Sequence, residues 1–292
     1  QLNPVAVAAV DCAFLLAIAG VFLTEILAGR NWRNLKVLAP LFLLLAANVS
    51  FHAETLATGA VNIGSRLGLA AIVLLIMLIG GRIVPSFTRN WLAARKDTRM
   101  PVPFGRLDAI ALGTGAVALA GWSLLGSSMA VAFLLALAAL LHLVRLSHWR
   151  GGATWRNPLL LMLHVAYAFV PLGLLAAAAG SAGIIPDAAG LHLLGIGAIG
   201  GMTLAVMIRA TLGHTGRSLT AGPALTAAFF LVIASAFTRA LLGHGAVAGI
   251  DGITLAALLW TIGYAIVLWR MLPWLMGEKA GSKKPAGRVV KP

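Results

Sequence analysis

Charged side chains are scarce in this sequence. Lysine, arginine, aspartate and glutamate make up 10% of its 292 residues, whereas hydrophobic residues make up 60%. A soluble domain carries about 25% charged residues, so this chain lacks the polar surface that a compact core in water needs. Together with a mean hydropathy of +0.96, this scarcity predicts a protein whose solvent is lipid.

Cysteine and acidic residues are also rare. The single cysteine, Cys12, excludes an internal disulfide and a cysteine-based zinc site. Eight acidic residues against 22 basic ones give a net charge of +14, a balance that also occurs in nucleic-acid-binding proteins. Here, however, the basic residues lie between apolar runs of spanning length and do not cluster on one soluble element. We therefore expect no nucleic-acid partner.

Nine apolar runs are long enough to form membrane-spanning helices, which need about 20 residues. They lie at roughly 5–28, 36–52, 64–84, 107–126, 129–147, 158–179, 189–209, 222–243 and 251–274. The second run is short, so it is expected to stand nearly upright or to thin the bilayer. The fold class is therefore an all-α, polytopic transmembrane helix bundle over residues 1–277, followed by a basic, disordered tail over residues 278–292.

Basic residues collect in every second loop of this arrangement. The first, third, fifth and seventh loops and the tail hold 20 of the 22, with Arg82 and Arg89 assigned to the third loop and Arg145 to the fifth. Only Arg66 and Arg239 fall on the other side. Because cytoplasmic loops are enriched in lysine and arginine, the alternation predicts a cytoplasmic C-terminus and an outward-facing start of the chain.

Gly195, Gly197 and Gly200 form the spacing GxGxxG. This spacing indicates a dinucleotide site only where a strand precedes it in a soluble βαβ unit, and no such unit is present in the sequence. Gly197 and Gly201 also fit the GxxxG spacing of closely packed membrane helices. We therefore interpret these glycines as packing residues.

The seven histidines are the residues most able to carry chemistry, because ionisable groups inside a membrane are costly and often mark functional sites. The predicted topology sorts them into an outer group of His52, His192 and His244 and an inner group of His142, His164, His214 and the loop residue His148. Several histidines at one depth favour a metal or haem site. A single histidine more often makes a polar contact between helices.

Three other polar positions have two interpretations each. His164 and Tyr167 share a helix face at i and i+3, so they could line a cofactor pocket or a proton path, or simply bond to a neighbouring helix. Asp11 lies within the first predicted span, where a carboxylate could relay protons. Glu25 could do the same or pair with the basic loop beside it.

Three stretches carry a family resemblance. They are GGRIVPSFTRNWL at 80–92, NPLLLMLHVAY at 157–167 and GGMTLAVMIRATLGHTGR at 200–217. Together with Arg33-Asn34-Leu35 and the pair Asn48 and His52, they resemble the NnrS family across nearly the whole chain.

This resemblance implies a bacterial inner-membrane protein that binds haem, of b type, and copper. It also implies a role in nitric oxide metabolism, denitrification and defence against nitrosative stress. Family members resemble twelve-span proteins, so about three N-terminal spans, with a His-x-His pair that they normally carry, are expected to be missing from this chain.

By match to the family's motifs, the candidate haem or copper ligands are His52, His164, His192 and His214, with Tyr167 as a further cofactor-lining residue. Arg82, Arg209 and Arg217 could contact haem propionates or anionic lipid, because guanidinium groups match carboxylates. Anchoring at the cytoplasmic surface is the alternative role for these arginines. His142 and His244 rank lower because they fall outside the motif stretches.

The leading functional hypothesis is a haem-dependent membrane protein that acts on nitric oxide as a sink or a reductase. Nitric oxide dissolves in lipid and could reach a buried iron laterally. Reduction would also need protons and electrons, for which Asp11, Tyr167 and a quinol are candidate providers. The alternative is a transporter or a haem or copper delivery protein, which the absence of a clear internal repeat disfavours. A structural or sensory role and the oligomeric state stay open.

Overall fold

The computed structural model describes residues 3–32, 35, 38–243 and 245–280. His244, the basic residues Arg33 and Lys36, and the predicted tail from residue 281 onward lie outside the described residues.

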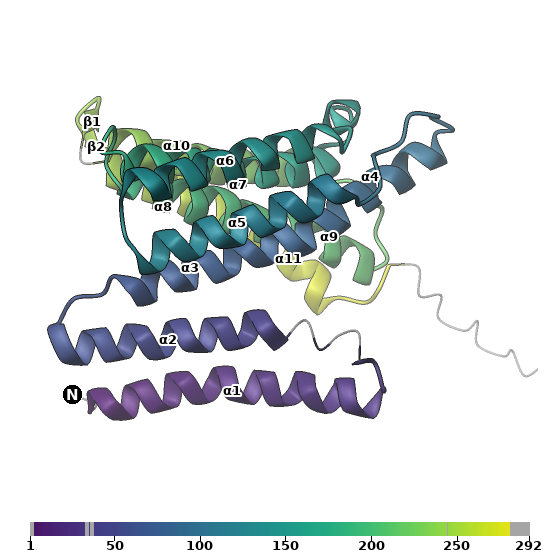
Figure 1. Cartoon of the computed structure of the whole chain (residues 1–292). Helices are drawn as coiled ribbons and strands as arrows, with labels where there is room; N and C mark the ends of the chain where they lie inside the picture. Colours follow the sequence, from purple (N-terminus) through teal and green to yellow (C-terminus); the bar gives the residue numbers. More distant parts are fainter. Residues whose placement is uncertain (1–2, 33–34, 36–37, 244, 281–292) are drawn as a thin grey trace, which may run out of the picture.

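Helices make up almost all of the described chain (Figure 1). In chain order the elements are α1 (Pro4–Ala28), α2 (Leu38–Thr58), α3 (Ile63–Leu75), η2 (Ile76–Gly80), α4 (Gly81–Ala94), α5 (Arg106–Leu124), α6 (Met129–Ser147), η3 (Gly151–Thr154), α7 (Pro158–Ser181), α8 (Ala188–His192), η4 (Leu193–Gly200), α9 (Gly201–His214), α10 (Gly222–Leu242), β1 (Ala246–Val247), β2 (Ile250–Asp251) and α11 (Gly252–Met276).

Nine helical stretches of the described chain are long and apolar enough to cross a bilayer, which confirms the predicted polytopic all-α bundle. The third stretch joins α3, η2 and α4 into one helix of 32 residues, and the seventh joins α8, η4 and α9 into one of 27 residues. Both contain a π-helical segment, η2 or η4. Such segments are rare and frequently occur at functional sites.

The second span is longer than the sequence predicted. Helix α2 continues to Thr58 and has 21 residues, whereas the predicted span ended at residue 52. Within the added turn lies Glu54, whose carboxylate accepts hydrogen bonds from the backbone N–H groups of Asn62 and Ile63 at 2.7 and 3.0 Å. Because this acid caps the start of α3, the helix can keep it, and no thinning of the bilayer is required.

Several arginines assigned to loops lie on helices. The third span runs to Ala94 through Pro85, so Arg82 and Arg89 belong to α4, and Arg145 belongs to the last turn of α6. Arg89 remains helical and still reaches outward, where its Nη2 donates to the Pro101 carbonyl at 3.0 Å. Hydropathy predicts where the chain leaves the hydrocarbon core of the bilayer. The helical hydrogen bonds can continue beyond that point, so arginines outside the apolar run can still be helical.

Helix α7 is the central element of the bundle. Of its most apolar window, 67% is buried, whereas the value is 6% for α1 and for α2. Helix α7 packs against α6, α8, η4 and α9, while α1 and α2 form a hairpin at one side of the molecule (Figure 1). Side chains of α7 that point inward are therefore the most shielded from lipid.

The helix ends form two layers because successive spans alternate in direction. We call the end at which α4, α6 and α9 finish the basic end, since the described loops there carry most of the lysines and arginines. Among the described residues, Arg66 and Arg239 lie toward the opposite end. Arg66 is held there by Asp187 at 3.5 Å. At the same end Asp251 caps α11, and hydrogen bonds from Thr254 hold the pKa of its exposed carboxyl below the ordinary value.

Glycines bring the seventh span close to α7. A Cβ at Gly197 would overlap the Phe169 ring, and one at Gly190 would lie 2.7 Å from Cα of Ala177. Close approach through small residues is how helices gain packing energy in lipid. The packing interpretation of Gly197 is therefore confirmed, and it lies in η4 with no strand before it among the described residues.

Replacing Gly197 by alanine should lower the stability of the bundle by about 1–3 kcal/mol, the usual effect of overpacking a core. Gly213→Ala is the matched control, because it lies in the same span and a Cβ there meets nothing within 4 Å. Thermal unfolding of the two variants in detergent micelles measures the difference. Equal melting temperatures would show that α7 and η4 are not closely packed here.

Candidate functional site

His164 lies on α7 and is 5% exposed. Its Nδ1 lies 3.0 Å from the Leu160 carbonyl oxygen, one turn earlier. Its Nε2 lies 3.4 Å from both Thr88 Oγ1 and the Trp149 carbonyl oxygen. The shorter distance assigns the ring proton to Nδ1, which donates to Leu160. The Thr88 hydroxyl donates its proton to the Val84 carbonyl at 2.9 Å. In this tautomer the lone pair of Nε2 therefore accepts no hydrogen bond from Thr88.

The connection between α6 and α7 folds over this imidazole ring. Arg150 adopts a left-handed backbone conformation with φ of 61°, which costs a non-glycine residue about 1–3 kcal/mol, and it leads into η3. Gly151 then packs directly on His164, since a Cβ there would lie 2.8 Å from the ring Cδ2. Only glycine lets the backbone cover the ring so closely.

A cavity of about 800 Å³ lies beside His164 at the basic end. Sites for small molecules and cofactors usually measure about 300–1,000 Å³. Arg99 and Arg150 line the cavity together with one carboxylate, that of Asp97. The Nε of Arg150 is buried and has no hydrogen-bond partner among the described residues. The cavity thus combines an imidazole with guanidinium groups suited to an anionic ligand.

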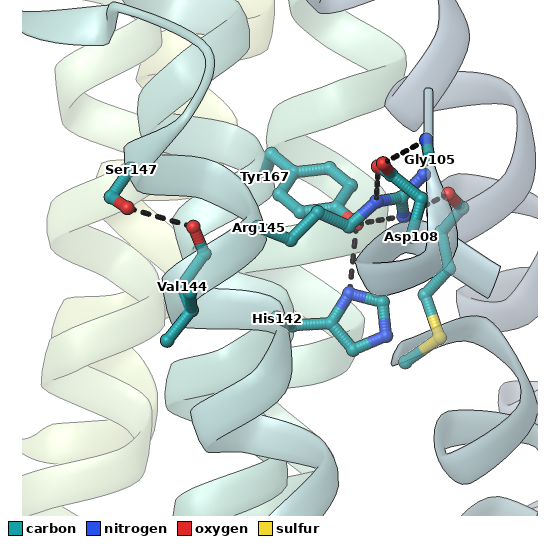
Figure 2. A network of polar contacts seen from close by, with 8 residues as sticks. Gly105, Asp108, His142, Val144, Arg145, Ser147 and Tyr167 are labelled. Atoms are coloured by element: carbon teal, nitrogen blue, oxygen red, sulfur yellow. Dashed lines mark hydrogen bonds and ion pairs between the residues drawn. The ribbon is translucent and has the colours of Figure 1, made fainter. Parts of the chain in front are cut away.

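A second polar cluster lies deeper in the same half of the bundle (Figure 2). The Tyr167 hydroxyl accepts a hydrogen bond from Nη1 of Arg145 at 2.8 Å and lies 2.9 Å from Nδ1 of His142. The Nε of Arg145 donates to Asp108 Oδ1 at 2.7 Å. His142 and Tyr167 are both 0% exposed, and Arg145 is 1% exposed.

Segment η2 completes this cluster. The Met77 carbonyl in η2 accepts a hydrogen bond from Nη1 of Arg145 at 2.8 Å. The other end of the guanidinium packs on Gly81, where a Cβ would overlap it. The Arg145 charge also lies 5.3 Å from the ring centre of Trp149, a favourable cation–π geometry. The Arg145 charge can be buried here because Asp108 neutralises it and acceptors face Nε and Nη1, whereas Nη2 has no hydrogen-bond partner among the described residues.

A family model described as NnrS protein matches residues 2–279 of the chain. The chain belongs to the NnrS family. Membership places it among membrane proteins related to nitric oxide. No curated protein and no solved structure matches the chain.

The predicted histidine ligands of this NnrS protein lie on three different spans, with His192 and His214 at opposite ends of one of them. His164 adjoins the cavity, whereas His52 lies on α2 with its Nε2 at 3.0 Å from Asp11 Oδ2 of α1. His192 is the last residue of α8 and lies near the charge of Arg239. His214 is the exposed last residue of α9. Within the described part of the chain, no three His, Cys, Asp or Glu side chains gather as a metal cluster. The ligand roles of these four histidines stay predictions.

The three predicted propionate-binding arginines do not line the cavity. Arg82 is exposed on α4. Arg209 lies 3.8 Å from the ring centre of Phe87, and Arg217 lies 5.2 Å from that of Trp274. Their positions at the basic end fit the anchoring role that the sequence analysis also allowed.

Several residues of the two sites were not among the predicted site residues. The sequence ranks His142 below the four candidate ligands, places Arg145 in a loop and predicts no role for Asp108 or Met77. The available signal was His142 and Arg145 at i and i+3 in one span, together with an acid inside the neighbouring span. Tyr167 bonds to the neighbouring helix α6 through His142, which is the second of the two interpretations the sequence allows, and its role as a cofactor-lining residue stays a prediction.

Asp108→Asn should destabilise the protein by about 3–5 kcal/mol, because it leaves the buried Arg145 charge without its counter-ion. Asp97→Asn is the control, since Asp97 lies 3.9 Å from the largely exposed Arg99 and such surface pairs contribute about 0–1 kcal/mol. Unfolding by added denaturing detergent measures both variants. If the two variants lost the same amount of stability, a group other than Asp108 would have to neutralise the Arg145 charge.

Proposed function

We propose that this NnrS protein binds a b-type haem and copper in the bacterial inner membrane and acts on nitric oxide, as a sink or a reductase. The observation that supports this proposal most directly is His164, a buried imidazole beside a cavity of about 800 Å³, whose Nε2 lies no closer than 3.4 Å to Thr88 Oγ1 and to the Trp149 carbonyl oxygen. Such a protein would serve nitric oxide metabolism, denitrification and defence against nitrosative stress.

The donor set of the cavity fits a haem. Neutral imidazole is a common axial ligand of haem iron, and metal-binding histidines usually donate their second N–H to a carbonyl or carboxylate, as His164 does to Leu160. Arg99 and Arg150 could neutralise the two propionates, and the buried Nε of Arg150 offers an unused donor. When bound, the haem would supply an iron centre able to bind a diatomic gas and to change its oxidation state.

The residues around the cavity would set the conditions for that chemistry. Leu160 would hold the His164 ring in one orientation, and Gly151 would keep the backbone against it. Val165 and Ala168 of α7 give the cavity an apolar wall on the bundle side, and nitric oxide, which dissolves in lipid, would reach that wall from the lipid phase. His52, His192 and His214 remain proposed ligands for further metal at other depths.

We also propose an orientation for the chain. The basic end would face the cytoplasm, because lysine and arginine concentrate on the cytoplasmic side of inner-membrane proteins. The C-terminus would then be cytoplasmic, with residues 1–277 as the bundle and 278–292 as a basic tail near anionic headgroups. In the described start of that tail, the backbone N–H of Ala280 donates to the Thr215 carbonyl at 2.9 Å.

Protein purified with added haem should show a Soret band, and His164→Ala should remove or shift it because the axial imidazole is lost. His148→Ala is the control, since His148 is an exposed residue at the end of α6. Absorption spectra of the oxidised and reduced forms measure the effect. An unchanged spectrum in His164→Ala would exclude His164 as the axial ligand.

Proteoliposomes with a quinol reductant should consume nitric oxide under anaerobic conditions, and His164→Ala should slow the consumption at least about tenfold if the iron site carries it. A nitric oxide electrode gives the rate, with empty liposomes and His148→Ala as controls. Stoichiometric uptake without turnover would identify a sink. Flux of haem or copper across the membrane without gas uptake would instead support the delivery function.

A further inference from the structure

The second ring nitrogen of His142 is, with Nη2 of Arg145, one of two buried polar atoms of this cluster that have no hydrogen-bond partner among the described residues. His142 is 0% exposed on α6, and its Nδ1 contacts the Tyr167 hydroxyl at 2.9 Å. Its Nε2 is buried and has no hydrogen-bond partner among the described residues. The Ala111 backbone faces the ring as well, but without hydrogen-bond geometry. An unsatisfied buried nitrogen costs about 1–3 kcal/mol, so its retention calls for a ligand.

A thioether lies on the same side of the ring. Gly115 of α5 lies against both groups: a Cβ added there would lie 3.0 Å from Met77 Sδ and 3.1 Å from His142 Nε2. The sulfur and the nitrogen therefore both face one point beside the Gly115 backbone. Any other residue at 115 would place a carbon atom in close contact with both of them.

We propose that His142 Nε2 and Met77 Sδ together bind one copper(I) ion. The inference rests on the proposed function only in taking copper as a cofactor of this family. A thioether is a soft ligand that selects copper(I) over magnesium, calcium or manganese, and imidazole also suits copper. Structural zinc requires four ligands, which the residues around Gly115 do not supply.

The charge of the surroundings favours a monovalent ion. Arg145 and Asp108 neutralise each other at 2.7 Å, so the site itself contributes no net negative charge. Placing a charge in such a buried site is costly, and the cost is smaller for one positive charge than for two. Copper(I), held largely by covalent bonds to nitrogen and sulfur, meets that condition.

Tyr167 and Arg145 act as positioning residues for the metal ligand. With the metal on Nε2, the ring proton resides on Nδ1 and donates to the Tyr167 oxygen, which also accepts a hydrogen bond from Arg145. A ligating histidine is commonly held in this way by an outer hydrogen bond. Arg145 is fixed in turn by Asp108 and by the Met77 carbonyl, so one network orients both ligands.

The test measures copper(I) on the purified full chain, by competition with a colorimetric copper(I) chelator and by X-ray absorption at the copper edge. All proteins carry Cys12→Ser, so that no thiolate contributes. Met77→Leu and His142→Gln should each lose one copper per chain, and Tyr167→Phe should weaken copper(I) binding by about 10–100-fold. Met271→Leu, another buried methionine but on α11, should keep the copper.

Glycine variants of α5 test the copper site without changing either of its ligands. Gly115→Ala should displace the copper by steric contact with both ligands, whereas Gly113→Ala, with nothing within 4 Å of its Cβ, should keep it. A copper spectrum of the Cys12→Ser parent without sulfur neighbours, or equal copper content in Met77→Leu and the parent, would overturn the proposal. If the Met77 and His142 variants lose copper but keep the Soret band, the copper site is separate from the haem site. If the parent binds copper but shows no Soret band, the proposed haem binding is contradicted and the proposed copper site is not.

Discussion

The guanidinium of Arg145 is the group around which the basic half of this bundle is arranged. It is 1% exposed inside a membrane span, and lipid offers no acceptor to its donors. Its acceptors come from three elements: Asp108 of α5, the Met77 backbone of η2 and Tyr167 of α7. Since a buried arginine tolerates little change in these distances, one side chain constrains how four spans approach one another.

Two aromatic rings connect the candidate haem cavity with the proposed copper site. The Tyr167 ring lies 4.4 Å from that of Trp149, centre to centre. The Trp149 carbonyl faces Nε2 of His164, and the Tyr167 hydroxyl faces His142. Both rings are almost completely buried, and packed cores rearrange in discrete steps rather than continuously. A displacement of His164 or His142 by a ligand could therefore be passed to the other histidine through the packed rings of Trp149 and Tyr167.

The number of spans and the alternation of charge could be predicted because both depend on sums over many residues. The free energy of placing an apolar run in lipid is such a sum, so one exception does not change it. The site depends on single side chains instead. A basic residue near the end of a span can reach solvent, as Arg89 does, or turn inward, as Arg145 does. The side chain of Arg145 turns inward to Asp108 on the neighbouring helix, a partner that the sequence around Arg145 does not contain.

Two π-helical segments, η2 with Met77 and η4, interrupt the helical periodicity on which a reading of helix faces from sequence depends. Helical periodicity places successive side chains about 100° apart around the axis, and an extra residue in a turn rotates everything that follows by about that angle. A helix face extrapolated from α3 through η2 is therefore wrong for α4. The wider hydrogen bonding of a π turn also leaves carbonyls open to outside donors, which here admits Arg145 to the Met77 carbonyl. Segment η4 begins directly after His192, so both departures from α-helical geometry adjoin residues that can bind metal.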